Sequence, residues 1–153
     1  MELWRICKKK YAASAFSGVG AEKTGGRWNC KGHPVVYTSE NLSLATLELF
    51  VHVPPPMIPN DLIAICAQIP NSVSQEFIEI PDLPKNWQQY PASSKLQDIG
   101  TDWIERGSAL VLKVPSAINP RESNLLLNPA HPEMKKLKVI AEQPFKFDPR
   151  MFK

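Results

Sequence analysis

The sequence has none of the long apolar runs or paired cysteines that mark membrane proteins and disulfide-rich secreted proteins. No stretch approaches the ~18 consecutive apolar residues of a membrane-spanning helix, and the start of the chain has no apolar signal-peptide core. The cysteines Cys7, Cys30 and Cys66 are odd in number and lack the CxxC or Cys/His spacing of a zinc site. We therefore expect a cytoplasmic, reduced protein with no membrane segment and no metal.

Motifs of the commonest catalytic mechanisms are also missing. The sequence contains no nucleophile elbow, no HExxH zinc motif, no GxGxxG dinucleotide fingerprint and no P-loop. What remains for an enzyme of this size is a reaction that a cation, a carboxylate and hydroxyl groups can carry out.

Neither sign of charge dominates the sequence. The formal net charge is +3, and the 43% hydrophobic and 22% charged residues are ordinary for a globular protein. We interpret the two basic runs, residues 8–10 and 135–138, as solvated faces, because a nucleic-acid-binding protein usually carries a stronger basic stripe. Such charge suits an anionic small ligand or an acidic partner surface equally well.

Proline, in contrast, is abundant. The 15 prolines against 7 glycines predict short elements joined by rigid, irregular connections. The 153 residues fit one domain, residues 1–153. Strand patterns outnumber helical ones and do not alternate regularly with them. The sequence therefore predicts the α+β class, a single compact domain with a mixed or antiparallel central sheet and a few short helices.

The individual elements follow from local patterns. Helical patterns occur at residues 40–52, with Ser39 as N-cap, and at residues 94–107, where Gly107 ends the helix. Residues 11–24, rich in alanine, serine and glycine, are expected to form a loop after at most a short helical turn. Strands are expected at residues 3–6, 35–38, 61–69, 76–80, 109–114, 125–127 and 137–141, with residues 144–150 as a further candidate at a sheet edge.

Three residues between Gly25 and Glu48 carry the strongest chemical signal. Two glycines precede Arg27, so the backbone can approach a ligand while the guanidinium grips phosphate oxygens. Tyr37 lies in a short strand and offers a flat, hydrogen-bonding ring. Glu48 falls on a helix with apolar residues on almost every side, where a carboxylate needs a cation or hydrogen-bond donors.

Each candidate also has a plainer interpretation. Arg27 can be a surface arginine after a turn, Tyr37 a core ring with a hydrated hydroxyl, and Glu48 a member of a structural ion pair. Ser116 can simply end a strand, and Asn128 can simply shape a loop. The lone histidines His52 and His131 are interpreted as structural.

A cation, a ring and an anion together suit cleavage of an N-glycosidic bond to a pyridinium. Nicotinamide leaves as a neutral molecule, so no general acid is needed, and the site has only to hold the diphosphate and stabilise an oxocarbenium-like sugar. A non-enzymatic nucleic-acid-binding module is the alternative from another class, but such a module gains nothing from the semi-buried Glu48.

Five short motifs, in this order, strongly resemble the RES domain family, which is named after an Arg, a Glu and a Ser. These three correspond to Arg27, Glu48 and Ser116, and the resemblance covers essentially the whole chain. The motifs are Gly25-Gly26-Arg27-Trp28-Asn29, Val36-Tyr37-Thr38-Ser39-Glu40, Leu44-Ala45-x-Leu47-Glu48, Val114-Pro115-Ser116 and Asn128-Pro129-x-His131-Pro132.

The resemblance implies a fold similar to ADP-ribosyltransferases and a role as the toxin of a bacterial type II toxin–antitoxin pair. Family members consume NAD+ by hydrolysis or by phosphorolysis with inorganic phosphate, and a relative ADP-ribosylates a metabolic enzyme instead. The implied partner is an Xre-type antitoxin that binds DNA itself and blocks the toxin's pocket, so no direct DNA binding is expected of this chain.

The same resemblance implies roles for single residues. Arg27 would hold the NAD+ diphosphate, and Tyr37 would pack on or orient the nicotinamide riboside. Glu48 would stabilise the developing ribosyl cation, Ser116 would hydrogen-bond the cofactor, and Asn128 is a lesser candidate for the same contact.

Overall fold

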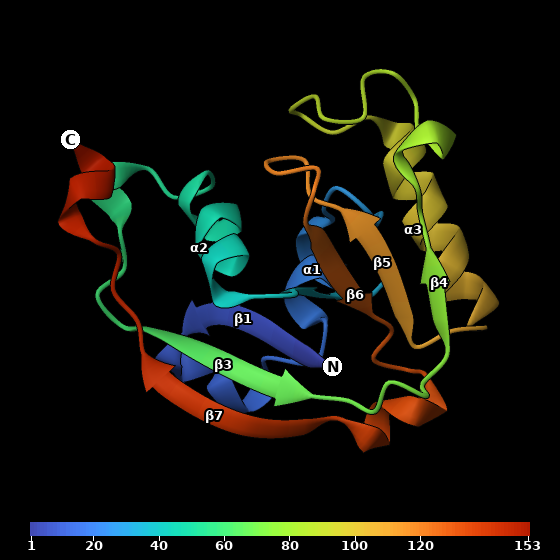
Figure 1. Cartoon of the computed structure of the whole chain (residues 1–153), viewed down its shortest axis with the longest axis horizontal. Coiled ribbons are helices and arrows are strands. Elements are labelled where there is room, and N and C mark those ends of the chain that lie inside the picture. The colour runs from blue at the N-terminus through green and yellow to red at the C-terminus, as the bar shows by residue number, and fades with distance from the viewer.

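One mixed sheet of seven strands organises the chain in a computed structural model that describes residues 1–153 (Figure 1). The α+β prediction is therefore confirmed. The strands are β1 (Glu2–Lys8), β2 (Val36–Ser39), β3 (Leu62–Gln68), β4 (Gln75–Phe77), β5 (Val111–Pro115), β6 (Ser123–Leu127) and β7 (Lys138–Pro144). Their order across the sheet is β4-β5-β6-β2-β1-β3-β7. Only β4 and β5 pair in parallel; the other neighbours are antiparallel.

The sheet has a weak seam between β1 and β2. Residue pairing there is limited to Trp4 with Ser39, whereas β1 pairs with β3 along its full length. Figure 1 shows the result: β7, β3 and β1 form one half of the sheet, and β6, β5 and β4 form another half that points away from it.

Three α-helices and five 3-10 segments complete the fold. The helices are α1 (Val19–Thr24), α2 (Leu42–Phe50) and α3 (Ser94–Arg106), and the 3-10 segments are Lys9–Ser14, Pro55–Met57, Ile80–Asp82, Pro132–Lys136 and Pro149–Phe152. Proline stands in the first turn of four of these 3-10 segments, where its fixed φ suits the start of a helical turn. Measured against the length and hydropathy of a bilayer span, every helix falls short.

Side chains on both faces of the sheet are buried. Along β5, Val111 belongs to one apolar cluster while Leu112 and Val114 belong to another on the opposite face, as strand alternation requires. The helix α3 covers the second face with Leu96 and Trp103, both almost fully buried. Figure 1 shows α3 lying along β5 and β4.

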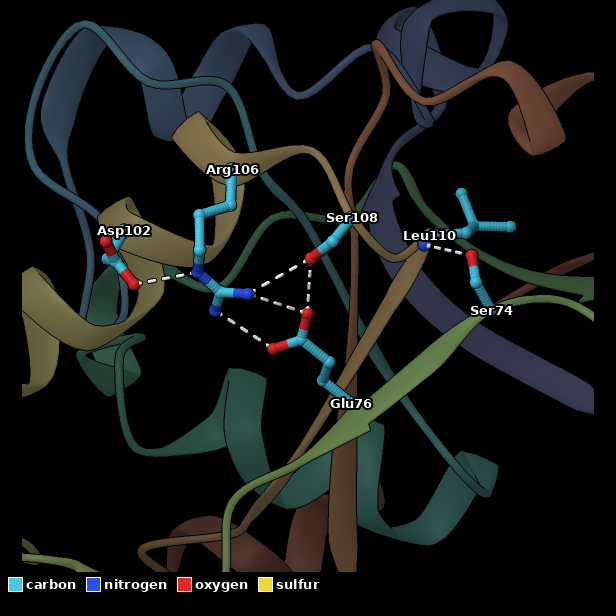
Figure 2. A network of polar contacts seen from close by, with 6 residues as sticks. All are labelled: Ser74, Glu76, Asp102, Arg106, Ser108 and Leu110. Carbon is cyan, nitrogen blue, oxygen red and sulfur yellow. Dashed lines mark hydrogen bonds and ion pairs between the residues drawn. The ribbon is translucent and has the colours of Figure 1, made fainter.

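A polar network fixes the end of α3 to the edge strand β4 (Figure 2). Arg106 donates from Nη1 and Nη2 to the two carboxylate oxygens of Glu76 at 2.9 and 3.0 Å, and from Nε to Asp102 at 2.9 Å. The Arg106 hydrogen bond lowers the pKa of the Glu76 carboxyl below its ordinary value. Because the pair is partly exposed to solvent, the network orients the helix end more than it stabilises the fold.

Close contact between α3 and the loop that follows α1 depends on a glycine. A Cβ added at Gly100 would lie 1.7 Å from the carbonyl oxygen of Trp28, a distance that no side chain can occupy. The loop carrying Arg27 therefore lies directly on the helix, and only glycine fits at position 100.

Some predictions about single elements are wrong. Ser39 ends β2 and is not a helix cap; Asn41 is the N-cap of α2, and its Oδ1 accepts from Leu44 N at 2.7 Å. The helix predicted for residues 40–52 spans only Leu42–Phe50; Leu44 and Ala45 are buried, and most of its other residues are half-buried. Its apolar residues are partly covered by the C-terminal aromatic residues Phe147 and Phe152, which pack on Phe50.

Three further differences concern chain segments. Residues 11–24, expected to form a loop, include α1 and part of a 3-10 segment. The strand predicted for residues 76–80 stops at Phe77, because a 3-10 turn with Pro81 follows. The strand expected for residues 144–150 ends at Pro144, and the chain then folds back toward α2.

Candidate active site

A cavity of about 1160 Å³ opens beside the seam of the sheet. It is bordered by β1, β2, α1, α2, the loop of residues 25–28 and the loop of residues 90–92. Its titratable, aromatic and amide side chains include Arg5, Arg27, Tyr37, Glu48, His52, Tyr90 and Asn124.

The loop that carries Arg27 is fixed by its own sequence. Gly25 adopts φ +71°, and a Cβ at Gly26 would lie 2.8 Å from the Tyr37 hydroxyl, so both positions favour glycine. Asn29 is fully buried; its Nδ2 donates to Ala21 O at 2.9 Å and its Oδ1 accepts from the Tyr37 hydroxyl at 2.7 Å. The glycine and asparagine positions of this motif therefore shape the loop from which Arg27 projects.

The Arg27 guanidinium has no carboxylate partner. Its Nη1 donates to the carbonyl oxygens of Trp87 and Gln89, at 2.9 and 3.2 Å. Burial lowers the pKa of Arg27, while the nearby Glu48 carboxylate raises it, and the group stays a cation at any physiological pH. A half-buried cation that contacts only neutral carbonyls is well placed to bind an anion.

Glu48 is held at one oxygen and free at the other. Its Oε1 accepts from Ser116 Oγ at 2.8 Å and from Asn124 Nδ2 at 2.6 Å, whereas no protein donor lies within hydrogen-bond distance of Oε2. Ser116 is fully buried, and its Oγ also accepts from the backbone N–H groups of Ile118 and Asn119. Because those bonds occupy the lone pairs of Oγ, its proton points to Glu48.

Asn124 was missed by sequence reasoning. It lies on β6, opposite Ser39 of β2, and Ser39 Oγ donates to its Oδ1 at 2.8 Å. That bond fixes the amide orientation, so that Nδ2 faces Glu48. The residue carries no local signal in the sequence, because the contact depends on the register of two strands.

Tyr37 presents a ring rather than a reactive hydroxyl. The hydroxyl donates to Asn29 Oδ1 at 2.7 Å and accepts from Trp28 N at 3.0 Å, so both hydrogen-bonding roles are taken. Burial raises the pKa of Tyr37 well above its ordinary value. The phenol therefore stays neutral and serves as a wall of the cavity.

Arg5 is the second residue that sequence reasoning missed. It lies on β1 and lines the cavity, its Nη1 donates to Tyr37 O at 2.9 Å, and its buried Nε has no partner. Burial lowers the pKa of this guanidinium, and no carboxylate pairs with it. A signal existed: strand alternation places Arg5 on the same face as Leu3, which is completely buried.

The remaining candidates divide between cavity and scaffold. His52, interpreted from the sequence as structural, is exposed and lines the cavity one helical turn after Glu48. His131, as predicted, is structural: its Nδ1 accepts from Glu133 N and caps a 3-10 segment. Asn128 lies outside the cavity, where its Oδ1 accepts from Ala130 N.

The structure thus brings together Arg27, Tyr37, Glu48 and Ser116 of the residues predicted from the sequence. It adds Arg5, Asn124 and His52 to them. No three His, Cys, Asp or Glu side chains lie close enough together to hold a metal ion. The arrangement offers two arginines, one carboxylate and aromatic walls, which can bind an anionic ligand and stabilise positive charge beside it.

The chain is similar to known proteins over nearly its whole length. The RES domain family model matches residues 2–148. The protein "Toxin Res" of Yersinia enterocolitica is 41% identical over 152 residues, covering 99% of each chain. The "Prs ADP-ribosylating toxin" of Sphingobium sp. strain YBL2 is 37% identical, covering 98% of this chain and 96% of that one.

A solved structure supports the fold. The crystal structure of the M. tuberculosis MbcT–MbcA toxin–antitoxin complex matches with a TM-score of 0.78 at 14% identity, over 99% of this chain and 86% of the compared chain. At that identity the likeness concerns the fold alone. Since the family model spans nearly the whole sequence and the relatives match end to end, the chain belongs to the RES domain family.

Proposed function

We propose that the chain is the toxin of a toxin–antitoxin pair and acts by cleaving the bond between nicotinamide and ribose in NAD+. The names of its relatives and the toxin–antitoxin complex among its structural neighbours support the first part. One observation carries the second part: Glu48 has one oxygen clamped and one free in a cavity that also holds two unpaired arginines.

The diphosphate of NAD+ binds to the arginines in this proposal. Arg27 exchanges its bonds to the carbonyls of Trp87 and Gln89 for charge-assisted bonds to phosphate oxygens. Arg5, with its free Nε, adds a second positive charge on the β1 side. Two cations match the two negative charges of the diphosphate.

Glu48 stabilises the transition state. As the bond from C1′ to the nicotinamide nitrogen breaks, its electron pair stays on nicotinamide, which leaves neutral, and positive charge develops on the ribose. The free Oε2 accepts a hydrogen bond from a ribose hydroxyl and lies near the developing positive charge. A fixed carboxylate there lowers the activation barrier for cleavage. Ser116 and Asn124 act as positioning residues that hold Oε1.

The acceptor completes the reaction. With water, its oxygen bonds to C1′ and a proton is released, giving ADP-ribose; with inorganic phosphate, a phosphate oxygen bonds to C1′ instead. A protein acceptor is a second candidate, favoured by the name of the ADP-ribosylating relative. A nucleic-acid-binding module has less support, since the cavity places a carboxylate where such a module needs positive charge.

The proposed partner is a protein antitoxin of the Xre type that inserts a segment into the cavity. This follows the family resemblance and the toxin–antitoxin complex of the structural neighbour. Such a segment would cover Glu48 and Arg27 together, since both line the same cavity.

Nicotinamide release from NAD+, with and without inorganic phosphate, tests the proposal. We expect the wild type to release nicotinamide. In Glu48→Ala the release rate should fall at least ~100-fold, as for the loss of a preorganised electrostatic group. Glu79→Ala, which removes an exposed glutamate outside the cavity, is the matched control and keeps the wild-type rate. Absence of nicotinamide release by the wild type under either condition, and with cell extract as a source of protein acceptors, would refute the proposal.

A further inference from the structure

Tyr90 is exposed where a large aromatic ring gains nothing for the fold. The residue is 75% exposed, the highest value among the large hydrophobic residues of the chain. It nevertheless lines the cavity, next to His52, which follows α2. An aromatic side chain in such a place is suited to contact a ligand.

The residues directly before Tyr90 are held in place by packing and hydrogen bonds. Trp87, three residues earlier, is buried in the core, and Gln88 Nε2 donates to Ala117 O at 3.0 Å. Arg27 adds its bonds to the carbonyls of Trp87 and Gln89. The loop therefore presents Tyr90 at a defined position beside Arg27.

The position of Tyr90 relative to Glu48 can be traced through His52. The Tyr90 and His52 ring centroids are 5.9 Å apart, with an interplanar angle of 56°. His52 follows Glu48 by one helical turn, about 6 Å. Together these two distances, each about 6 Å, place the Tyr90 ring within roughly 12 Å of Glu48. The short spacing and the tilt leave no room for a third ring between the two, so a planar ligand group must stack on the outer face of Tyr90.

We infer that Tyr90 is the stacking residue for the adenine ring of the dinucleotide, an inference that rests on the proposed function. With Glu48 at the nicotinamide riboside and Arg27 at the diphosphate, the second base extends past Arg27 to the adjoining loop. Trp87 and Gln88 keep that loop in place when Arg27 turns to the phosphates. There the base meets the exposed Tyr90 face. Tyr90 therefore makes the site prefer a dinucleotide over a mononucleotide.

Equilibrium binding of NAD+ and of nicotinamide mononucleotide, measured by calorimetry in a Glu48→Gln background that slows turnover, tests the inference. The mononucleotide lacks the adenosine half. In Tyr90→Ala the ratio of the mononucleotide Kd to the NAD+ Kd falls about tenfold, the size of a lost base–aromatic stack. Tyr90→Phe keeps the ratio within about twofold, since its ring still stacks.

Phe77→Ala is the control, because it removes another exposed ring, 57% exposed, that lies outside the cavity; it keeps the wild-type ratio. An unchanged ratio in Tyr90→Ala, or absence of NAD+ binding to every variant, would overturn the inference. The proposed function is tested by a separate measurement, nicotinamide release. If the wild type releases nicotinamide from NAD+ while Tyr90→Ala keeps the ratio of Kd values, the proposed function stands and the role of Tyr90 is refuted.

Discussion

The two charged ends of the cavity are held in different ways. Glu48 is fixed by two side chains, the hydroxyl of Ser116 directly after β5 and the amide of Asn124 on β6. Arg27 is held by two backbone carbonyls of a surface loop. The carboxylate is thus preorganised for charge that develops during reaction, whereas the arginine keeps bonds that a phosphate can replace. Substitutions at each end should separate catalysis from binding.

The largest expected effect comes from Gly100 of α3, which lies against the backbone of Trp28, the residue after Arg27. In Gly100→Ala the new Cβ collides with the Trp28 carbonyl, which is backbone and cannot rotate away. We expect a loss of about 3 kcal/mol in the free energy of unfolding, at the upper end of overpacking costs. Chemical denaturation measures it. Gly20→Ala in α1, where a Cβ meets nothing within 4 Å, is the control and should be neutral or slightly stabilising.

Ser116→Ala breaks the carboxylate end. Removal of the hydroxyl frees Glu48 Oε1 from one of its two donors and leaves the carboxylate free to turn. We expect kcat for nicotinamide release to fall about 100-fold, the cost of a misplaced group of about 1 Å, with little change in KM. Ser108→Ala removes an exposed hydroxyl from the network in Figure 2 and should leave both constants unchanged. Equal loss in both variants would contradict the assignment.

Arg27→Lys breaks the arginine end more gently. Lysine keeps the charge but cannot bridge two phosphate oxygens with one rigid plane. KM for NAD+ should rise about tenfold, equivalent to about 1.4 kcal/mol, while kcat changes less. Arg121→Lys, at an exposed position outside the cavity, is the matched exchange. A fall in kcat without a rise in KM would show that the two ends are not separate.

Tyr37→Phe gives the smallest effect and a pH signature. It removes a hydroxyl that bonds to Trp28 N and Asn29 Oδ1, at an expected cost of about 1 kcal/mol in unfolding free energy. Because burial raises the Tyr37 pKa, the folded state keeps a proton that the unfolded state loses above about pH 10. Stability of the wild type should therefore decline as pH rises above about 10, and this decline should be smaller in Tyr37→Phe. Urea denaturation at pH 9 and 11 checks it.

Sequence reasoning succeeded where signals are local. Gly107 ends α3 in the left-handed conformation as predicted, with φ +61°, and the strand patterns located the sheet. It failed at Ser39, whose type suits a helix cap, because pairing of β2 with β6 gives this serine a partner on another strand. Tertiary structure outweighed the local preference.

The same limit applies to the candidate site. Arg27, Tyr37 and Glu48 lie within one continuous stretch and could be found from spacing and family resemblance. Asn124 reaches Glu48 across 76 positions of sequence, and only the register of β2 and β6 brings them together. Strand alternation with Leu3 indicates that Arg5 points inward, but only the tertiary structure shows that this side of β1 faces a cavity.

The seam between β1 and β2 gives the ligand a mechanical role. Where the strands pair only through Trp4 and Ser39, the Arg5 side chain donates to the Tyr37 carbonyl of β2 and so joins the two halves of the sheet. A phosphate bound to Arg5 would replace the Arg5–Tyr37 hydrogen bond as the contact between the two halves of the sheet. Bound nucleotide would then connect the halves, and hydrogen exchange of the β1 and β2 amides should slow when NAD+ binds.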